Sequence, residues 1–455
     1  MEDKRVNSNI DIIRKILHLD DKTIAVVKAE LMKRLGAGVK YSFLSAISIM
    51  PWFVRLASFY ERMVFKTMCK PYDRKGSDMV FVSCIDPVHR VKSFPLIAKD
   101  LSYILFFLPT VTRPTEARRY YRHYSTNSNE KVFFGTFSTE DVRQYRIFLK
   151  ENAGAINQIK CDSKNDTKVQ RDYVKRFALY SIYSHRVFKD IGNDTIWLFE
   201  HDKFFFIPVI AEFRDKMIQT VQLQHGTFFD PDLTTYFPLY TDKVICCSER
   251  EANLYRESGV KGKDISVVGA PLQTIGHKNI EGCEMKYDIA VILTDTSTQL
   301  LEIQQKALKH LREHYTHEKI LIRFRPRSVA QDKQKLANYV DGFTVSEGTS
   351  LVHDLCSAQR IITFSLDAVF EIIRVKKNFV VIVPPSVHYA GDLNGICYSI
   401  DEMEMAMNEL FNGDEAKKQK CYIANFGETD VRKIRENFKN TILGLKTQIA
   451  EPKTV

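Results

Sequence analysis

The sequence lacks the features of membrane-spanning, secreted, zinc-binding and nucleic-acid-binding proteins. No window reaches the ~18 to 20 apolar residues that a spanning helix needs. The amino-terminal MEDKRVNSNID is polar, unlike a secretory signal. The nine cysteines contain no Cys-x-x-Cys pair, so they suit small buried hydrophobes in a reducing compartment better than a zinc site. No nucleic-acid-binding module is present. We therefore expect a cytoplasmic protein that carries no metal and no cofactor.

Positive charge is concentrated at one end of the chain. The net charge is +10 over 455 residues. Residues 1–75 hold fifteen Lys or Arg against eight Asp or Glu, a net of +7. This region also contains the apolar stretch YSFLSAISIMPWFVRL, with Trp52 and Phe53. A basic, aromatic, amphipathic segment suits an anionic membrane surface, so residues 1–60 could bind the inner face of the cell membrane peripherally. The alternative is an ordinary amphipathic helix that packs on the domain.

Strands and helices alternate over most of the chain, which predicts an α/β fold. Apolar strands without polar alternation, such as MVFVSC and RIITFS, are typical of a parallel sheet covered by helices on both faces. We expect the helix TEDVRQYRIFLKENA to have Thr139 as its N-cap. The stretch QTIGHKNIEGCEMK indicates a linker, which places a domain boundary near residue 280. The predicted regions are a helical basic segment (1–75), an N-terminal Rossmann-like domain (76–280), a C-terminal Rossmann-like domain (281–435), and a C-terminal helix and tail (436–455).

Polar residues stand at the predicted carboxyl ends of strands in both halves of the chain. IQTVQLQ leads into His225 and Gly226, and KILIRFR contains Arg325, followed by Pro326. RIITFS ends at Ser365, just before a helix. Open α/β sheets bind ligands at the carboxyl ends of their strands. The sequence therefore predicts two Rossmann-like parallel-sheet domains that face each other across a cleft.

The order of these motifs resembles one enzyme group. QHGTFFDP, TDKVICCSEREANLYRESGV, ISVVGAP, RFRPRS and TFSLDAVFE follow one another as in the GT-B glycosyltransferases of bacterial surface-polysaccharide assembly. The resemblance covers roughly residues 75–430 and is strongest to the capsule and teichoic-acid group, with its sialyl-, polysialyl- and CDP-glycerol transferases. It implies an inverting, metal-independent enzyme. The C-terminal domain would bind a nucleotide-sugar donor, and the N-terminal domain would bind a glycan or lipid-linked acceptor.

The donor site implied by the resemblance departs from the family in one position. The family's His-Pro, whose His contacts the donor phosphate, is replaced here by Arg325 and Pro326. Arginine binds phosphate but keeps its proton, so phosphate binding is retained and acid catalysis by this residue is not. Ser365 matches the family's phosphate-binding Ser/Thr, and Glu371 its ribose-binding acid. The alternative for Arg325 is a solvated basic strand end, and the alternative for Ser365 is a plain N-cap. The predicted donor-binding residues are Gly226, Thr294, Thr296, Ser297, Arg323, Arg325, Pro326, Arg327, Ser365, Asp367 and Glu371.

The general base should come from the N-terminal domain. An acceptor hydroxyl loses its proton as it attacks the anomeric carbon, so a carboxylate or His must lie nearby. Asp86 follows the first strand, Glu200 and Asp202 follow another, and in the family a His-Gly like His225-Gly226 serves catalysis or donor binding. The alternative for each is loop solvation, capping or a turn. The predicted catalytic residues are His225, Asp86, Glu200 and Asp202.

Two patterns imitate metal sites. Asp230 and Asp232 form a DxD around a proline, which indicates a turn. His310, His314 and His317 lie at helical spacing but lack the HExxH order, so we interpret them as solvated surface.

Three other functions remain open. A CDP-polyol phosphotransferase of teichoic-acid type would keep the fold, but such members usually have Trp where Gln224 precedes His-Gly. A non-catalytic GT-B-like membrane partner is kept open by the missing His-Pro. An epimerase of the same fold usually has Asp-Ser-Gly-Gly, which is absent from TFSLDAV.

Overall fold

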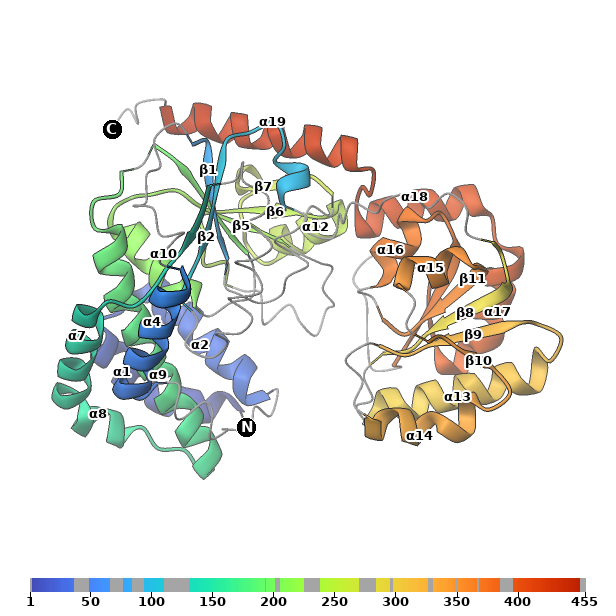
Figure 1. The fold of residues 1–455 in the computed structure, drawn as a ribbon, viewed down its shortest axis with the longest axis horizontal. Helices are drawn as coiled ribbons and strands as arrows, with labels where there is room; N and C mark the ends of the chain where they lie inside the picture. Colours follow the sequence, from blue (N-terminus) through green and yellow to red (C-terminus); the bar gives the residue numbers. More distant parts are fainter. Residues whose placement is uncertain are drawn as a thin grey trace.

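The computed structural model contains two parallel sheets, each covered by helices (Figure 1). In the part of the chain that it describes, one sheet has seven strands and the other six. The α/β fold with two Rossmann-like units is thus confirmed. The described residues are 2–36, 49–65, 77–83, 94–109, 131–192, 194–200, 205–224, 238–269, 284–294, 298–325, 330–347, 350–365, 368–384 and 396–450.

The first sheet has the order β3-β2-β1-β4-β5-β6-β7, with every pair parallel. Alternate residues of β1 enter the hydrophobic clusters on opposite faces: Phe81 on one and Val82 on the other. Both faces are covered, which explains why the strands are apolar runs without alternation. Its strands are β1 (Met79–Ser83), β2 (Tyr103–Phe107), β3 (Lys131–Phe134), β4 (Ile196–Glu200), β5 (Thr220–Leu223), β6 (Lys243–Cys246) and β7 (Ile265–Val267).

One face of this sheet carries an aromatic core. Trp197 of β4 is fully buried, and its ring packs edge-on against Phe213 and Phe188. The helices of this part of the chain are α1 (Glu2–Leu17), α2 (Asp21–Gly36), α4 (Pro51–Phe65), α7 (Thr139–Glu151), α8 (Ala153–Gln158), α9 (Lys164–Phe188), α10 (Phe206–Asp215), α12 (Glu249–Glu257) and the 3-10 turn η2 (Gly262–Asp264).

The first two helices form a pair that packs on the domain. Ile13 of α1 and Val27 and Leu31 of α2 are fully buried in one cluster with residues of α8, α9 and α10. Asn9 reinforces this contact by donating a hydrogen bond to Oε1 of Gln170 at 3.0 Å. The apolar faces of α1 and α2 are therefore used within the fold, as the packed-helix alternative predicts for them.

The second sheet has the order β10-β9-β8-β11-β12-β13, again with every pair parallel. Its central strand β8 sends Ala290 and Ile292 to one hydrophobic cluster and Ile289 and Val291 to the other. Its strands are β8 (Tyr287–Ile292), β9 (Ile320–Arg323), β10 (Thr344–Val345), β11 (Ala358–Thr363), β12 (Asn378–Val383) and β13 (Cys397–Ser399).

Helices cover both faces of this sheet. One face packs against α15, α16 and α18, and the other against α13, α14 and α17. The helices are α13 (Thr298–His314), α14 (Ala330–Val340), α15 (Leu351–Cys356), α16 (Val369–Arg374), the 3-10 turn η4 (Ile400–Glu402), α17 (Met403–Asn412), α18 (Glu415–Phe426) and α19 (Val431–Ala450).

The last helix returns to the first sheet, along which it runs in Figure 1. Ile434, Phe438 and Ile442 of α19 are fully buried in the same cluster as Phe81 and Phe94. Lys446 donates a hydrogen bond to Oδ1 of Asp78, directly before β1. The amphipathic face of α19 is thus a structural part of the first domain, although the second sheet precedes it in the chain.

Ser138, and not Thr139, is the N-cap of α7, so that prediction was wrong by one residue. The Ser138 hydroxyl accepts from the Asp141 N–H at 3.0 Å, and the Asp141 carboxylate accepts from the Ser138 N–H at 2.6 Å. This reciprocal capping box favours Ser138, because only from that position does the third helical residue supply a carboxylate. The predicted boundary near residue 280 lies outside the described residues.

Candidate functional site

The predicted site residues divide between described and undescribed parts of the chain. The structure describes Glu200, Thr294, Arg323, Arg325, Ser365 and Glu371. Outside the described residues lie His225, Asp86, Asp202, Gly226, Thr296, Ser297, Pro326, Arg327 and Asp367, together with Asp230 and Asp232.

Glu200 ends β4 at the carboxyl edge of the first sheet. The pairing of Val82 with Phe199 places Ser83, the last residue of β1, beside it. The Ser83 hydroxyl donates a hydrogen bond to Oε2 of Glu200 at 3.1 Å, and both side chains are buried. A hydroxyl bonded to one carboxylate oxygen fixes the orientation of the carboxylate. Ser83 was not predicted from the sequence; the signal was a hydroxyl that closes an apolar strand.

The end of β5, which leads to residue 225, is also fixed. The Gln224 N–H donates to the Ile245 carbonyl at 3.0 Å, which extends the pairing of β5 with β6 by one residue. The thiol of Cys247 lies 4.0 Å from the Gln224 carbonyl oxygen. Gln224 is fully buried. Gln224, which directly precedes the predicted His-Gly loop in sequence, therefore has a defined position between the ends of β4 and β6.

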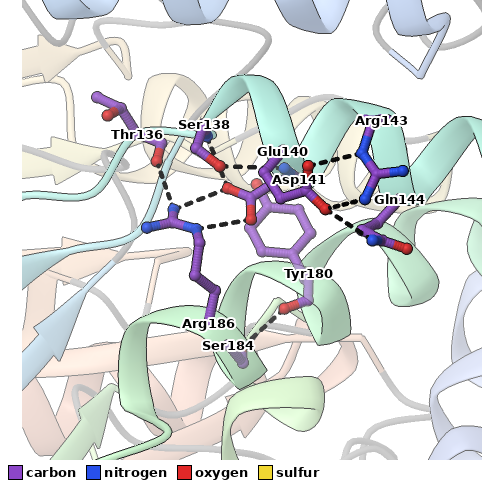
Figure 2. Close-up of polar contacts among 9 residues, drawn as sticks. All are labelled: Thr136, Ser138, Glu140, Asp141, Arg143, Gln144, Tyr180, Ser184 and Arg186. Carbon is purple, nitrogen blue, oxygen red and sulfur yellow. Dashed lines mark hydrogen bonds and ion pairs between the residues drawn. The ribbon is translucent and has the colours of Figure 1, made fainter.

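An ion pair between a half-buried arginine and a buried aspartate anchors the same edge of the sheet after β3 (Figure 2). Arg186, at the end of α9, donates to both carboxylate oxygens of Asp141 at 2.7 Å each and to the Thr136 carbonyl at 3.2 Å. Burial acts to lower the pKa of Arg186, but the hydrogen bonds that it donates to Asp141 raise the pKa overall. Asp141 also closes the capping box of Ser138. This carboxylate is therefore committed to holding β3, α7 and α9 together and is not a candidate base.

Strand pairing brings the predicted donor residues together at the carboxyl edge of the second sheet. Ile292 of β8 pairs with Arg323 of β9 on one side and with Thr363 of β11 on the other. Thr294 and Ser365 each follow two residues after those paired positions, and Arg325 follows two residues after Arg323. Three adjacent central strands thus end in Arg, Thr and Ser residues. This is the place where open parallel sheets bind ligands.

Arg323 is held from within the domain. Its Nη1 donates to Oδ2 of Asp354, a buried carboxylate on α15, which also accepts from the Ser346 hydroxyl at 2.6 Å. Charge-assisted hydrogen bonds of this kind are strong and directional. Arg323 therefore ties β9 and β10 to α15. Arg325 is half-buried and lies two residues beyond the end of β9. Asp354 was missed because a helix sequence does not show which strand end its carboxylate reaches.

Buried polar side chains also shape the neighbouring strand ends. The Thr294 N–H donates to Oε1 of Gln304 at 3.0 Å. The Ser365 N–H donates to the hydroxyl of Thr363 at 3.0 Å, and that hydroxyl donates back to the Ser365 carbonyl. Gln304 and Thr363 are fully buried. Gln304 could have been found, since it is a polar residue on the otherwise apolar buried face of its helix.

The helix after Ser365 begins later than predicted. The sequence predicts a helix directly after Ser365, but α16 begins at Val369, and its N-cap Ala368 offers no side-chain hydrogen bond. α16 has six residues, so its aligned dipole is short. An anion at this strand end would therefore depend on side chains and loop N–H groups more than on the helix.

Glu371 lies inside α16. Burial raises the pKa of Glu371, against the opposing effect of Arg374, and the two side chains form an ion pair one turn apart. Its carboxylate therefore already has a cationic partner on its own helix.

Metal ligands do not gather in the described part of the chain: it contains no group of three or more His, Cys, Asp or Glu that could hold an ion. The rings of His310 and His314 lie 4.5 Å apart between centroids, at an interplanar angle of 40°. Burial and the neighbouring His314 lower the pKa of His310. Within the same residues, no helix has the length and apolarity to cross a membrane.

Comparisons with known proteins identify the fold. No protein-family model matches the chain, and the search of curated proteins found no match. Among solved structures, UDP-GlcNAc 2-epimerase from Methanocaldococcus jannaschii is similar at 10% identity and a TM-score of 0.51, over 80% of this chain and 99% of that chain. The N-terminal domain of Candida albicans trehalose-6-phosphate phosphatase is similar at 9% identity and a TM-score of 0.51, over 84% and 99%. At such identities the similarity shows the fold alone, and that fold is the two-domain GT-B arrangement.

Proposed function

We propose that this protein is a glycosyltransferase that moves a sugar from a nucleotide-activated donor to a glycan or lipid-linked acceptor. The reaction would invert the configuration at the anomeric carbon and would need no metal ion. Bacterial capsule, O-antigen or related surface-polysaccharide synthesis is the setting that the sequence resemblance favours. The fold is compatible with this function without being specific to it, because unrelated activities share one fold.

The observation that carries the proposal is the convergence of Arg325, Thr294 and Ser365 on the ends of β9, β8 and β11. Neighbouring central strands of a parallel sheet are where such folds bind nucleotides. A permanently charged guanidinium on one strand end, with hydroxyl residues on the two neighbouring strand ends, is a chemically suitable combination for binding a diphosphate or monophosphate. Asp354 would act as a positioning residue by holding Arg323 and, through it, the end of the strand that carries Arg325.

The chemistry follows from that arrangement. The acceptor hydroxyl would attack the anomeric carbon as the bond between that carbon and the phosphate oxygen breaks. The nucleotide leaves with the bonding electron pair, and Arg325 would stabilise its developing charge. The hydroxyl proton passes to a base of the first domain.

Glu200 is the candidate base for which the structure gives a defined environment. Ser83 orients its carboxylate at the carboxyl edge of the first sheet. His225, Asp86 and Asp202 remain further candidates by sequence position. Each of the four residues can be substituted in turn. The base is the residue whose substitution abolishes transfer while donor binding is retained.

Two alternatives make different predictions. A CDP-polyol phosphotransferase would bind CDP-polyols in preference to sugar nucleotides. A non-catalytic GT-B-like partner at the membrane would bind a nucleotide without consuming it. The replacement of the family's His by Arg325 is the feature that favours the non-catalytic alternative.

The direct test is a thermal-shift series with the full chain. CMP, CDP, UDP and GDP and their sugar conjugates are compared with the corresponding nucleosides, which lack phosphate. Stabilisation by one nucleotide class and not by its nucleoside supports the proposal. Stabilisation by none of the nucleotides would refute the proposal. Preference for a CDP-polyol would instead support the alternative, a polyol-phosphate transferase.

A further inference from the structure

Helix α4 presents an apolar stripe to solvent. Trp52, Leu56 and Phe59 are 56%, 58% and 56% exposed, and Met50, just before the helix, is 45% exposed. Spacings of four and three residues place the three helical side chains on one face. Isolated exposed apolar residues are normal on a protein surface, but a contiguous set on one helix face marks an interaction site.

The opposite face of α4 is fixed to the domain. Val54 is fully buried, and Ala57 is buried with it in the core cluster that includes residues of α7 and α9. Just before the helix, the Ile49 carbonyl accepts a hydrogen bond from the buried Tyr145 hydroxyl of α7 at 3.1 Å. The stripe is therefore displayed by an anchored helix (α4 in Figure 1), and its exposure does not come from a detached segment.

Neither α1 nor α2 offers such a face. The apolar sides of α1 and α2 are buried against α8, α9 and α10. If the amino-terminal region contacts another body through apolar groups in the part that the structure describes, α4 is the element that does so.

The charge around the stripe is positive. Arg55 is exposed within it, between Trp52 and Phe59 in sequence. The neighbouring helix α7 exposes three cationic side chains, Arg143, Arg146 and Lys150, against the acidic Glu140 and Glu151. The first 75 residues carry a net charge of +7. Aromatic and aliphatic side chains flanked by Arg and Lys match a lipid surface with anionic headgroups.

We infer that α4 is the surface by which the first domain binds an anionic lipid bilayer, with Trp52, Leu56 and Phe59 inserted and Arg55 at the phosphates. A second copy of the chain is the less suitable occupant. From Trp52 to Phe59 the stripe is only ~10 Å long, whereas a stable protein interface covers about 800 Å² on each partner. A bilayer needs no shape complementarity, and the inference does not depend on the proposed transfer reaction.

The two tryptophans give the test a built-in reference. Trp52 is exposed and Trp197 is fully buried, so a change in emission or in acrylamide quenching on adding vesicles reports Trp52. Phosphatidylcholine vesicles are compared with vesicles that contain phosphatidylglycerol, using the full chain. We expect a blue shift, reduced quenching and co-sedimentation with the anionic vesicles, weakened by high salt.

The matched variants are Leu56→Gln/Phe59→Gln and, as control, Met405→Gln/Ile423→Gln, which removes two exposed apolar side chains from α17 and α18. We expect the first to weaken partitioning onto anionic vesicles at least tenfold and the second to leave it unchanged. Equal partitioning of both variants, or no vesicle binding by the parent chain, would overturn the inference. The inference would also be overturned if the parent chain self-associates without lipid, as measured by sedimentation, and only Leu56→Gln/Phe59→Gln abolishes that self-association. Nucleotide-induced thermal shifts are also measured for Leu56→Gln/Phe59→Gln. If they are retained, the result for vesicle binding is independent of the proposed transferase function.

Discussion

Gly427 packs directly against the backbone of Cys247, which joins the segment between α18 and α19 to the end of β6. Gly427 has φ +93°, and a Cβ at this position would overlap the Cys247 carbonyl oxygen. Gly269, with φ +103°, lies in the same contact, where a Cβ would approach the Glu428 carbonyl oxygen to 2.7 Å. The segment after β7, at Gly269, and the segment after α18, at Gly427, therefore approach each other closely through glycines.

The first prediction concerns this contact. Gly427→Ala should destabilise the protein by more than the ~1–3 kcal/mol of a strained backbone, because the added Cβ also meets a carbonyl that cannot rotate away. Gly342→Ala is the matched control: Gly342 has φ +86°, but a Cβ there meets nothing within 4 Å. Chemical denaturation measures both variants. Equal losses would show that the contact with Cys247 adds nothing.

The second prediction concerns the ion pair between Arg186 and the buried Asp141 in Figure 2. Arg186→Gln leaves the buried Asp141 carboxylate without its cation and should cost about 1.5–3 kcal/mol of unfolding free energy. Arg143→Gln on α7 removes an exposed pair with Glu140 and should leave stability unchanged. Urea denaturation compares the two. A destabilisation by Arg143→Gln as large as that by Arg186→Gln would contradict the structural role given to Asp141.

The third prediction concerns thiol reactivity. Burial raises the pKa of Cys246 and of Cys247 well above the usual range, and the nearby Glu251 adds to the effect. Since the thiolate is the reactive form, neither cysteine should be alkylated by iodoacetamide in the native protein at pH 8. Peptide mass spectrometry measures labelling at each position. The same reaction in urea is the control, and native labelling at the urea rate would contradict the buried placement of these two residues.

The fourth prediction concerns acid stability. Burial acts to raise the pKa of Asp78, but hydrogen bonds from Lys446 and Ser102 lower it overall. A folded-state pKa below the unfolded value contributes stability that is present above pH ~3.8 and is lost as pH falls further. The difference in stability between the parent chain and Asp78→Asn should therefore be constant above pH 5 and shrink below pH 4. Denaturation across this range tests it, and a difference that grows on acidification would contradict the ion pair between Asp78 and α19.

The sequence predicted the strands well where they are continuous apolar runs, as in β1, β8 and β12, because burial on both faces leaves a clear pattern. It placed the cap of α7 one residue late, since Ser138 and Thr139 are both capable caps and only the carboxylate of Asp141 decides between them. It could not place α19: an amphipathic helix shows that it has an apolar face, but not that the face packs on the first sheet.

The candidate site was predictable to a similar degree. Arg325, Thr294 and Ser365 could be placed near strand ends because strand ends are visible in the sequence, and the strand order of the structure makes those ends neighbours. Ser83 was missed because its partner Glu200 lies on a strand that is distant in sequence. Asp354 was missed because the local sequence does not show that α15 packs beside Arg323. The pairing of β1 with β4, which sets Ser83 beside Glu200, is a property of sheet order.

We propose that the carboxyl edge of the second sheet binds the phosphate of a nucleotide through Arg325. Isothermal titration of the nucleotide found in the thermal-shift series should show at least a tenfold weaker Kd for Arg325→Ala, about 1.4 kcal/mol. Arg360→Ala, which removes a half-buried arginine from the first half of β11 in the same domain, should leave the Kd unchanged. Equal affinity of the parent chain and Arg325→Ala would contradict the claim.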